Sequence, residues 1–81
     1  MFEKNGNGKT WKNSEGQYHR EDGPAVECLD GTRIWYVNGQ LHREDGPAIV
    51  RLNGGHEYYI KDRWFPKERY MYLLKKRKIY L

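Results

Sequence analysis

A mainly β fold, built from tandem β-hairpins in a single sheet layer and followed by one helix, is predicted by three features of this 81-residue chain. A seven-residue string, His-Arg-Glu-Asp-Gly-Pro-Ala, occupies residues 19–25 (string 1) and recurs letter for letter at residues 42–48 (string 2). Each copy is followed by a Gly-containing turn and a run of aromatic and β-branched residues. Residues 65–81 then change to good helix formers.

The two strings belong to a tandem repeat with a period of 23 residues. Gly8, Gly31 and Gly54 fall on the same period outside the strings. Repeats of this length indicate units that stack side by side. We therefore expect one domain over residues 1–81, with the hairpin repeats at residues 8–64.

The first full repeat is predicted to be a hairpin around Asp30-Gly31. Residues 25–29 and 32–37 are its expected strands, because they are rich in residues that favour β-structure. A two-residue type I′ turn favours Asp-Gly, since it needs positive φ at both positions. Such a loop sets Val26 opposite Trp35.

The second full repeat is predicted to have the same plan. Residues 47–52 and 55–60 are the expected strands around Asn53-Gly54, with Ile49 opposite Tyr58. The turn that connects the two repeats is Asn38-Gly39.

The start of the chain reads as an incomplete first repeat. Residues 1–7 are expected to lack regular structure, residues 9–12 to form a short edge strand, and residues 14–16 to turn. Together these segments predict an antiparallel meander of about five or six strands.

The end of the chain is predicted to be an amphipathic helix over residues 67–81 that closes the open end of the sheet. Pro66 suits the first turn of a helix, and no further Pro or Gly follows it. At about 100° per residue, one side carries Tyr70, Met71, Leu73, Leu74 and Leu81. The other side carries Tyr72, Lys75, Lys76 and Ile79.

The repeat resembles the MORN repeat, a β-hairpin unit of about this period. Residues 35–40 (Trp-Tyr-Val-Asn-Gly-Gln) resemble its aromatic strand and Asn-Gly turn, and Gly23 and Gly46 match its closing glycine. The string itself departs from the family and is similar to a divergent variant in small bacterial and phage proteins. The resemblance implies a hairpin fold and a binding role, with links to membrane lipids, protein scaffolds and antitoxin-like proteins, and no catalytic residues.

Charge is distributed unevenly along the chain. Residues 1–60 hold seven basic and nine acidic residues, a net charge of −2, whereas residues 61–81 hold eight and two, a net charge of +6. The basic end predicts an acidic partner. With a single cysteine, no apolar leader and no run of about 20 apolar residues, a cytoplasmic protein is expected and membrane association is not.

Two interpretations of the strings are open. A histidine near carboxylates suits a metal site or acid–base chemistry. Alternatively the string is a repeated turn, in which His and Arg bond the loop, Glu and Asp accept backbone N–H groups, and Gly-Pro sets the next strand. The second is favoured, because catalysis needs one asymmetric site and Phe65 replaces the next histidine of the period. The residues given this structural role are His19, Asp22, Gly23, Pro24, His42, Asp45, Gly46 and Pro47.

The sequence therefore predicts a binding protein with no enzymatic activity, no metal and no cofactor. We expect a small phage or bacterial accessory or inhibitor protein that masks a larger host protein with an acidic surface. The expected anchors are Trp35, Tyr36, Tyr58, Tyr59 and Trp64, and the expected steering charges are Arg63, Lys75, Lys76, Arg77 and Lys78. The anchors and the basic helix are expected to form one surface. The alternatives are nucleic-acid binding through the basic helix and self-assembly, for example as a homodimer.

Overall fold

The structure is a computed structural model that describes the backbone of residues 2–5 and 8–76 and the side chains of residues 8–76. Its described part confirms a mainly β fold with one C-terminal helix. The strands are β1 (Phe2–Asn5), β2 (Gly8–Trp11), β3 (Val26–Cys28), β4 (Arg33–Ile34), β5 (Tyr36–Val37), β6 (Gln40–Leu41), β7 (Ile49–Val50), β8 (Tyr58–Ile60) and β9 (Arg63–Phe65), and the helix is α1 (Lys67–Lys76).

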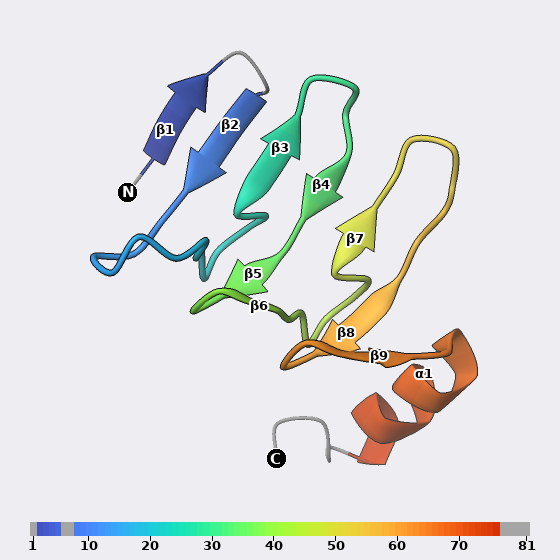
Figure 1. Ribbon diagram of the computed structural model, residues 1–81. Helices are drawn as coiled ribbons and strands as arrows, with labels where there is room; N and C mark the ends of the chain where they lie inside the picture. The colour runs from blue at the N-terminus through green and yellow to red at the C-terminus, as the bar shows by residue number, and fades with distance from the viewer. Residues whose placement is uncertain (1, 6–7, 77–81) are drawn as a thin grey trace.

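The hairpins lie side by side in a row, with α1 at the C-terminal end (Figure 1). All strand pairs are antiparallel. The expectation of one sheet of five or six strands is wrong in detail. The described residues form a five-stranded sheet of order β1-β2-β3-β4-β7 and two hairpins, β5-β6 and β8-β9. The predicted return strand divides at Trp35, because β4 pairs with β3 and β7 whereas β5 pairs with β6.

The N-terminal strand also differs from the prediction. Residues 2–5 form β1, which pairs with β2 along its whole length. Because β2 has β1 on one side and β3 on the other, it is an interior strand and not an edge.

The predicted registers are wrong by one residue, because the hairpin loops contain three residues and not two. Val26 lies opposite Ile34, and Ile49 lies opposite Glu57. Asp30 keeps a negative φ, and its carboxylate accepts the Thr32 N–H at 2.9 Å. Only the last loop residue, Gly31, has a positive φ, of 93°. This is the arrangement of a type I turn followed by a left-handed residue.

The turns that connect the repeats are type I′. Asn38 and Gly39 have φ values of 50° and 79°, as a type I′ turn requires and as the sequence predicts. One period later, Lys61 and Asp62 form the same turn without glycine, with φ values of 49° and 70°. Neither residue is a glycine, so the residue pattern did not predict a turn there. The Asp62 carboxylate accepts the Leu41 N–H at 2.7 Å, which offsets part of the conformational strain.

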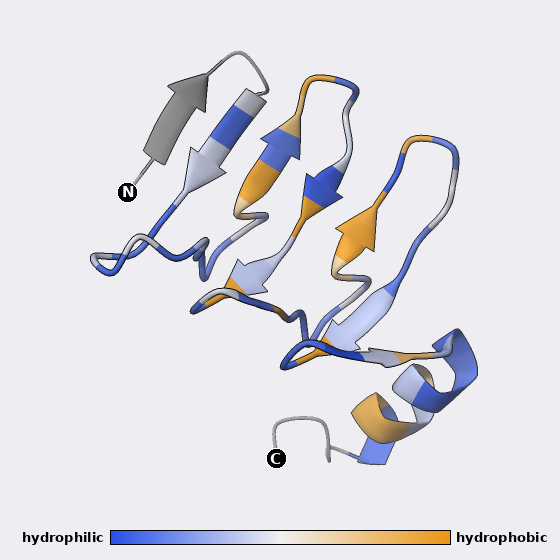
Figure 2. Cartoon of the chain, viewed as in Figure 1, coloured by the Kyte–Doolittle hydropathy of each residue, from blue (hydrophilic) through white to orange (hydrophobic). Residues whose placement is uncertain are grey.

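Among the described residues, a cluster of buried apolar side chains lies where α1 meets β8 and β9. Tyr58, Ile60 and the fully buried Tyr70 form its centre, and Phe65, Leu73 and Leu74 pack against them. Figure 2 shows a hydrophobic part of α1 at this end, and hydrophobic segments on β3 and β7 that continue into the loops after them. Met71, which was predicted on the buried side, is exposed. The helix docks through Tyr70, about 100° around its axis from Met71.

The last residue of each string explains the tight spacing of the repeats. Ala25 and Ala48 are fully buried between neighbouring strands. Ala48 donates its N–H to Glu57 O at 2.8 Å and accepts the Trp35 N–H at 2.7 Å. A larger side chain would separate these strands, so a small residue is required at this point of each string.

Candidate functional site

Each string is tied to the next hairpin by its histidine. Nδ1 of His19 accepts the Asn38 N–H at 2.9 Å, and Nδ1 of His42 accepts the Lys61 N–H at 3.1 Å. The ring hydrogen of His42 must then lie on Nε2, which donates to Glu44 at 3.0 Å. Both histidines therefore hold the first residue of a type I′ turn.

Each string is folded onto itself by its arginine. Arg43 donates from Nε to Asp45 at 2.9 Å and from Nη1 to Pro47 O at 3.0 Å. Arg20 makes the same two bonds to Asp22 and Pro24, both at 3.1 Å. The acidic residues thus pair with side chains of their own string, whereas the sequence predicted that they would accept backbone N–H groups.

The arginines also cover aromatic rings of the preceding repeat. The Arg20 guanidinium lies 3.9 Å from the ring centroid of Trp11, and that of Arg43 lies 3.8 Å from Trp35. A guanidinium over an indole ring is a favourable cation–π arrangement. Sequence analysis missed both arginines as functional residues, although the identity of the two strings pointed to them.

String 2 receives a side chain from α1. The Tyr70 hydroxyl donates to Arg43 O at 2.5 Å and accepts the Gly46 N–H at 3.2 Å. Its ring packs on Tyr58 with 4.8 Å between centroids. Burial raises the pKa of Tyr70, which keeps the hydroxyl protonated as a donor.

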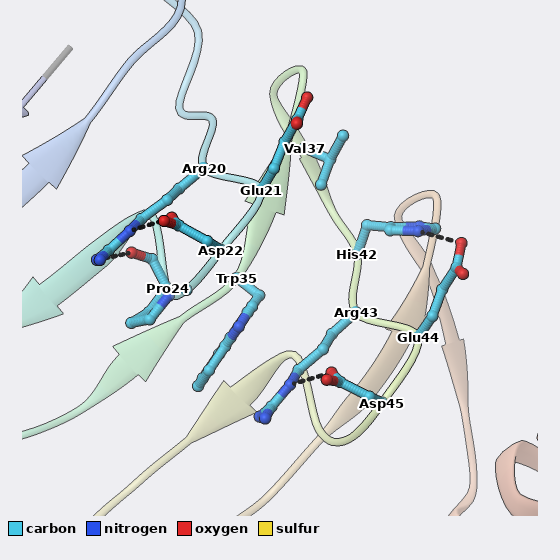
Figure 3. Close-up of a pocket in the computed structure, with 11 residues that line it drawn as sticks. Arg20, Glu21, Asp22, Pro24, Trp35, Val37, His42, Arg43, Glu44 and Asp45 are labelled. Carbon is cyan, nitrogen blue, oxygen red and sulfur yellow. Dashed lines mark hydrogen bonds and ion pairs between the residues drawn. The ribbon is translucent and has the colours of Figure 1, made fainter.

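An open groove of about 640 Å³ lies between the two strings. Figure 3 shows Trp35 and Val37 between string 1 on one side and string 2 on the other. The acidic side chains Glu21, Asp22, Glu44 and Asp45 border it. The volume falls within the range of ordinary ligand pockets, about 300–1,000 Å³.

The five predicted anchors do not share one surface. Adjacent residues of a strand point to opposite faces, and residues directly opposite in an antiparallel pair share a face. Tyr58 packs against α1, so its neighbour Tyr59 and the Tyr59 partner Trp64 lie on the reverse face. The expectation that the anchors and the basic helix form one surface is therefore wrong.

The reverse face carries a row of aromatic residues. Tyr36 is paired with Leu41 as Tyr59 is with Trp64, one period later. The Tyr36 ring also lies 5.2 Å from that of Tyr18. We call Tyr18, Tyr36, Leu41, Tyr59 and Trp64 the aromatic face. Tyr58, which is 8% exposed in the core, and Trp35, which lines the groove, lie outside it.

Glu57 connects the aromatic face to Arg51 by hydrogen bonds. Glu57 accepts bonds from Arg51 at 2.7 Å and from the Tyr59 hydroxyl at 3.1 Å. The Arg51 bond holds the pKa of Glu57 below its ordinary value of 4.5. Burial raises the pKa of Tyr59, and the Glu57 carboxylate raises it further.

Acid should weaken the fold partly through Glu57. Because its pKa is lowered in the folded state, its contribution is complete above pH 4.5 and is lost as the pH falls below that value. We expect Glu57→Gln to reduce the fall in the urea midpoint between neutral pH and pH 3. The control is Glu15→Gln, an exposed acid in another loop, which should keep the wild-type pH profile. If the urea midpoint of Glu57→Gln falls between neutral pH and pH 3 as much as that of the wild type, Glu57 does not have this role.

The outer side of α1 is basic. Arg69, Tyr72, Lys75 and Lys76 are exposed and fall within about 120° of one another around the helix axis; we call them the helix face. The exposed Glu68 lies within the same arc, so this side of the helix carries a net charge of +2. Arg63 is exposed on β9, and its guanidinium lies 5.3 Å from the Phe65 ring. Arg77 and Lys78 lie outside the residues that the structure describes.

Three surfaces thus remain as candidates: the groove, the aromatic face and the helix face. Within residues 8–76, no cluster of three His, Cys, Asp or Glu side chains could hold a metal ion. The described part of the chain contains no helix long and apolar enough to cross a membrane. Comparison with protein-family models, curated proteins and solved structures found no match.

Proposed function

We propose that this protein is a non-catalytic binding module that contacts a larger protein through its aromatic face. The observation that carries the proposal is Trp64, which is 56% exposed at the end of the row. Exposed aromatic side chains in a contiguous patch are typical of protein contact sites, where tryptophan and tyrosine contribute most binding energy. The resemblance to MORN repeats, which implies a binding role, supports the same proposal.

The partner that we propose is a host protein with an acidic surface, bound in the cytoplasm by an accessory or inhibitor protein of phage or bacterial origin. Lys61 and Lys67 lie on either side of β9 in the chain and are exposed, whereas Arg63, which is opposite Ile60, belongs to the other face. Positive charges at the rim of a contact site raise the association rate more than the affinity. Binding would mask the partner by occupation.

The test is a pull-down from bacterial lysate with the tagged full chain, with and without nuclease. One protein that survives nuclease and is depleted by Trp64→Ala supports the proposal. Loss of the tryptophan should weaken binding at least about tenfold, the effect of an interface hot spot. Leu52→Ala is the matched control, because Leu52 is even more exposed but lies at a loop tip outside the aromatic face.

The alternative is nucleic-acid binding through the helix face, which places three cations and the single carboxylate of Glu68 beside an exposed tyrosine. Recovery of RNA or DNA, with the proteins lost after nuclease, would replace the first proposal with this one. Affinity should then fall with salt by a slope near −0.9 for each phosphate contacted. Lys75→Glu should reduce that slope, whereas Trp64→Ala should leave it unchanged.

A further inference from the structure

The groove repeats, one period earlier, the pocket that α1 fills. At the C-terminal end, Tyr70 packs against Tyr58, Ile60 and Phe65. The residues 23 positions before these three are Trp35, Val37 and His42, and all three line the groove. The groove is therefore the internal counterpart of the site that receives Tyr70.

The backbone groups that bind Tyr70 also have counterparts in the groove. Tyr70 bonds to Arg43 O and Gly46 N, which correspond to Arg20 O and Gly23 N in string 1. Within the described residues, no hydrogen bond reaches Arg20 O or Gly23 N. The volume of about 640 Å³ remains although the Arg43 guanidinium covers one side of Trp35. The space and the polar groups suit another tyrosine side chain.

The acidic border of the groove favours a tyrosine that lies among positively charged residues. Glu21, Asp22 and Asp45 are 82–88% exposed at its border, and Glu44 is 49% exposed. The acids are only partly balanced by Arg20 and Arg43, which are held within their own strings. A tyrosine flanked by positive charges complements this border.

The chain itself presents such a segment on α1. The helix face holds Tyr72, 53% exposed, with Arg69, Lys75 and Lys76 around it. Glu68 lies on the same side, so the net charge around Tyr72 is +2. It is the same element that already inserts Tyr70 beside string 2. We infer that the helix face of one copy docks in the groove of a second copy, with the Tyr72 hydroxyl on Arg20 O and Gly23 N and the cations on the four carboxylates.

This contact joins two different surfaces, so it is heterologous and gives chains or rings rather than a closed two-fold dimer. It leaves the aromatic face free and is independent of the function proposed above. Charge-dominated association should be strongest at low salt.

The experiment is sedimentation velocity on the full chain from about 10 μM to 1 mM, at about 50 mM and 500 mM salt. We expect the mass to rise above the monomer value of 9.8 kDa with concentration at low salt and to approach it at high salt. Lys76→Glu and Tyr72→Ala should each weaken association roughly tenfold or more. Lys67→Glu has the same charge change on another side of α1 and should associate like the wild type.

Complementation separates this contact from other modes of association. Glu21→Lys reverses an exposed charge at the border of the groove and leaves the helix face intact, whereas Lys76→Glu with Tyr72→Ala does the reverse. Each variant alone should be monomeric, and their mixture should form a 1:1 complex and nothing larger. Urea unfolding checks that both variants are folded. A wild type that stays monomeric throughout, an equal effect of Lys67→Glu, or no complex in the mixture would each overturn the inference.

Discussion

Replacing Tyr70 by alanine should come close to unfolding the protein. The side chain is fully buried at the centre of the apolar cluster between α1 and β8, and its removal leaves a ring-sized cavity there. Truncation of a buried aromatic residue costs about 3–5 kcal/mol, against a total stability of about 4–12 kcal/mol for a chain of this length. Urea unfolding followed by tryptophan fluorescence measures the difference.

Tyr70→Phe isolates the hydroxyl. The ring remains, but Arg43 O and Gly46 N lose their partner, which should cost about 1–3 kcal/mol. Tyr72→Phe, two residues along on the exposed side of α1, is the control and should change stability by less than about 0.5 kcal/mol. Equal losses in the two variants would mean that the hydroxyl bonds to string 2 do not hold the helix.

The same residue predicts how the protein responds to alkali. Burial raises the pKa of Tyr70 in the folded state above its ordinary value of 10.0. Its contribution is therefore complete below pH 10 and is lost as the pH rises above that value, because the unfolded chain ionises first. Tyr70→Phe should show a smaller loss of stability above pH 10 than the wild type.

The 23-residue period was sufficient to predict most of the β-hairpin architecture. It predicts the row of hairpins and the turn at Asn38-Gly39, and the change of composition after Trp64 predicts the helix; the structure contains all three. It failed on register, because Asp-Gly suits both two-residue and three-residue loops. The Asp30 carboxylate on Thr32 N–H selects the longer loop, and this side-chain bond is not visible in the residue pattern.

The division of the aromatic residues between two faces could have been predicted from the sequence. Trp35 and Tyr36 are adjacent in a predicted strand, as are Tyr58 and Tyr59, so alternation alone puts the members of each pair on opposite faces. Grouping all of them as anchors on one surface overlooked that rule.

The groove, by contrast, could not be read from the sequence. It depends on how far apart the two strings lie after each has folded back on its own arginine. The choice of Tyr70 over Met71 as the buried residue likewise depends on the angle at which α1 docks. Both depend on tertiary packing, which the periodicity of the sequence does not predict.

Arg43→Ala should be the second most damaging substitution, at about 2–4 kcal/mol. It removes two charge-assisted hydrogen bonds, to Asp45 and Pro47 O, and a cation–π contact with Trp35. Hydrogen bonds to charged groups contribute about 1.5–3 kcal/mol, and a partly buried cation–π contact about 0.5–2 kcal/mol. Arg43→Lys keeps the charge but not the planar fork, so it should recover less than half of the loss in urea unfolding.

Arg20→Ala is the comparison, because Arg20 makes the same three contacts in string 1 and, in addition, an ion pair with Glu27 at 3.6 Å. We expect it to cost about 1–2 kcal/mol, less than Arg43→Ala. String 2 also supplies Arg43 O and Gly46 N to Tyr70, so a displaced string 2 disturbs the core as well as itself. If the two variants lose the same stability, each string is held only by its own contacts, and the link from string 2 to the helix contributes nothing measurable.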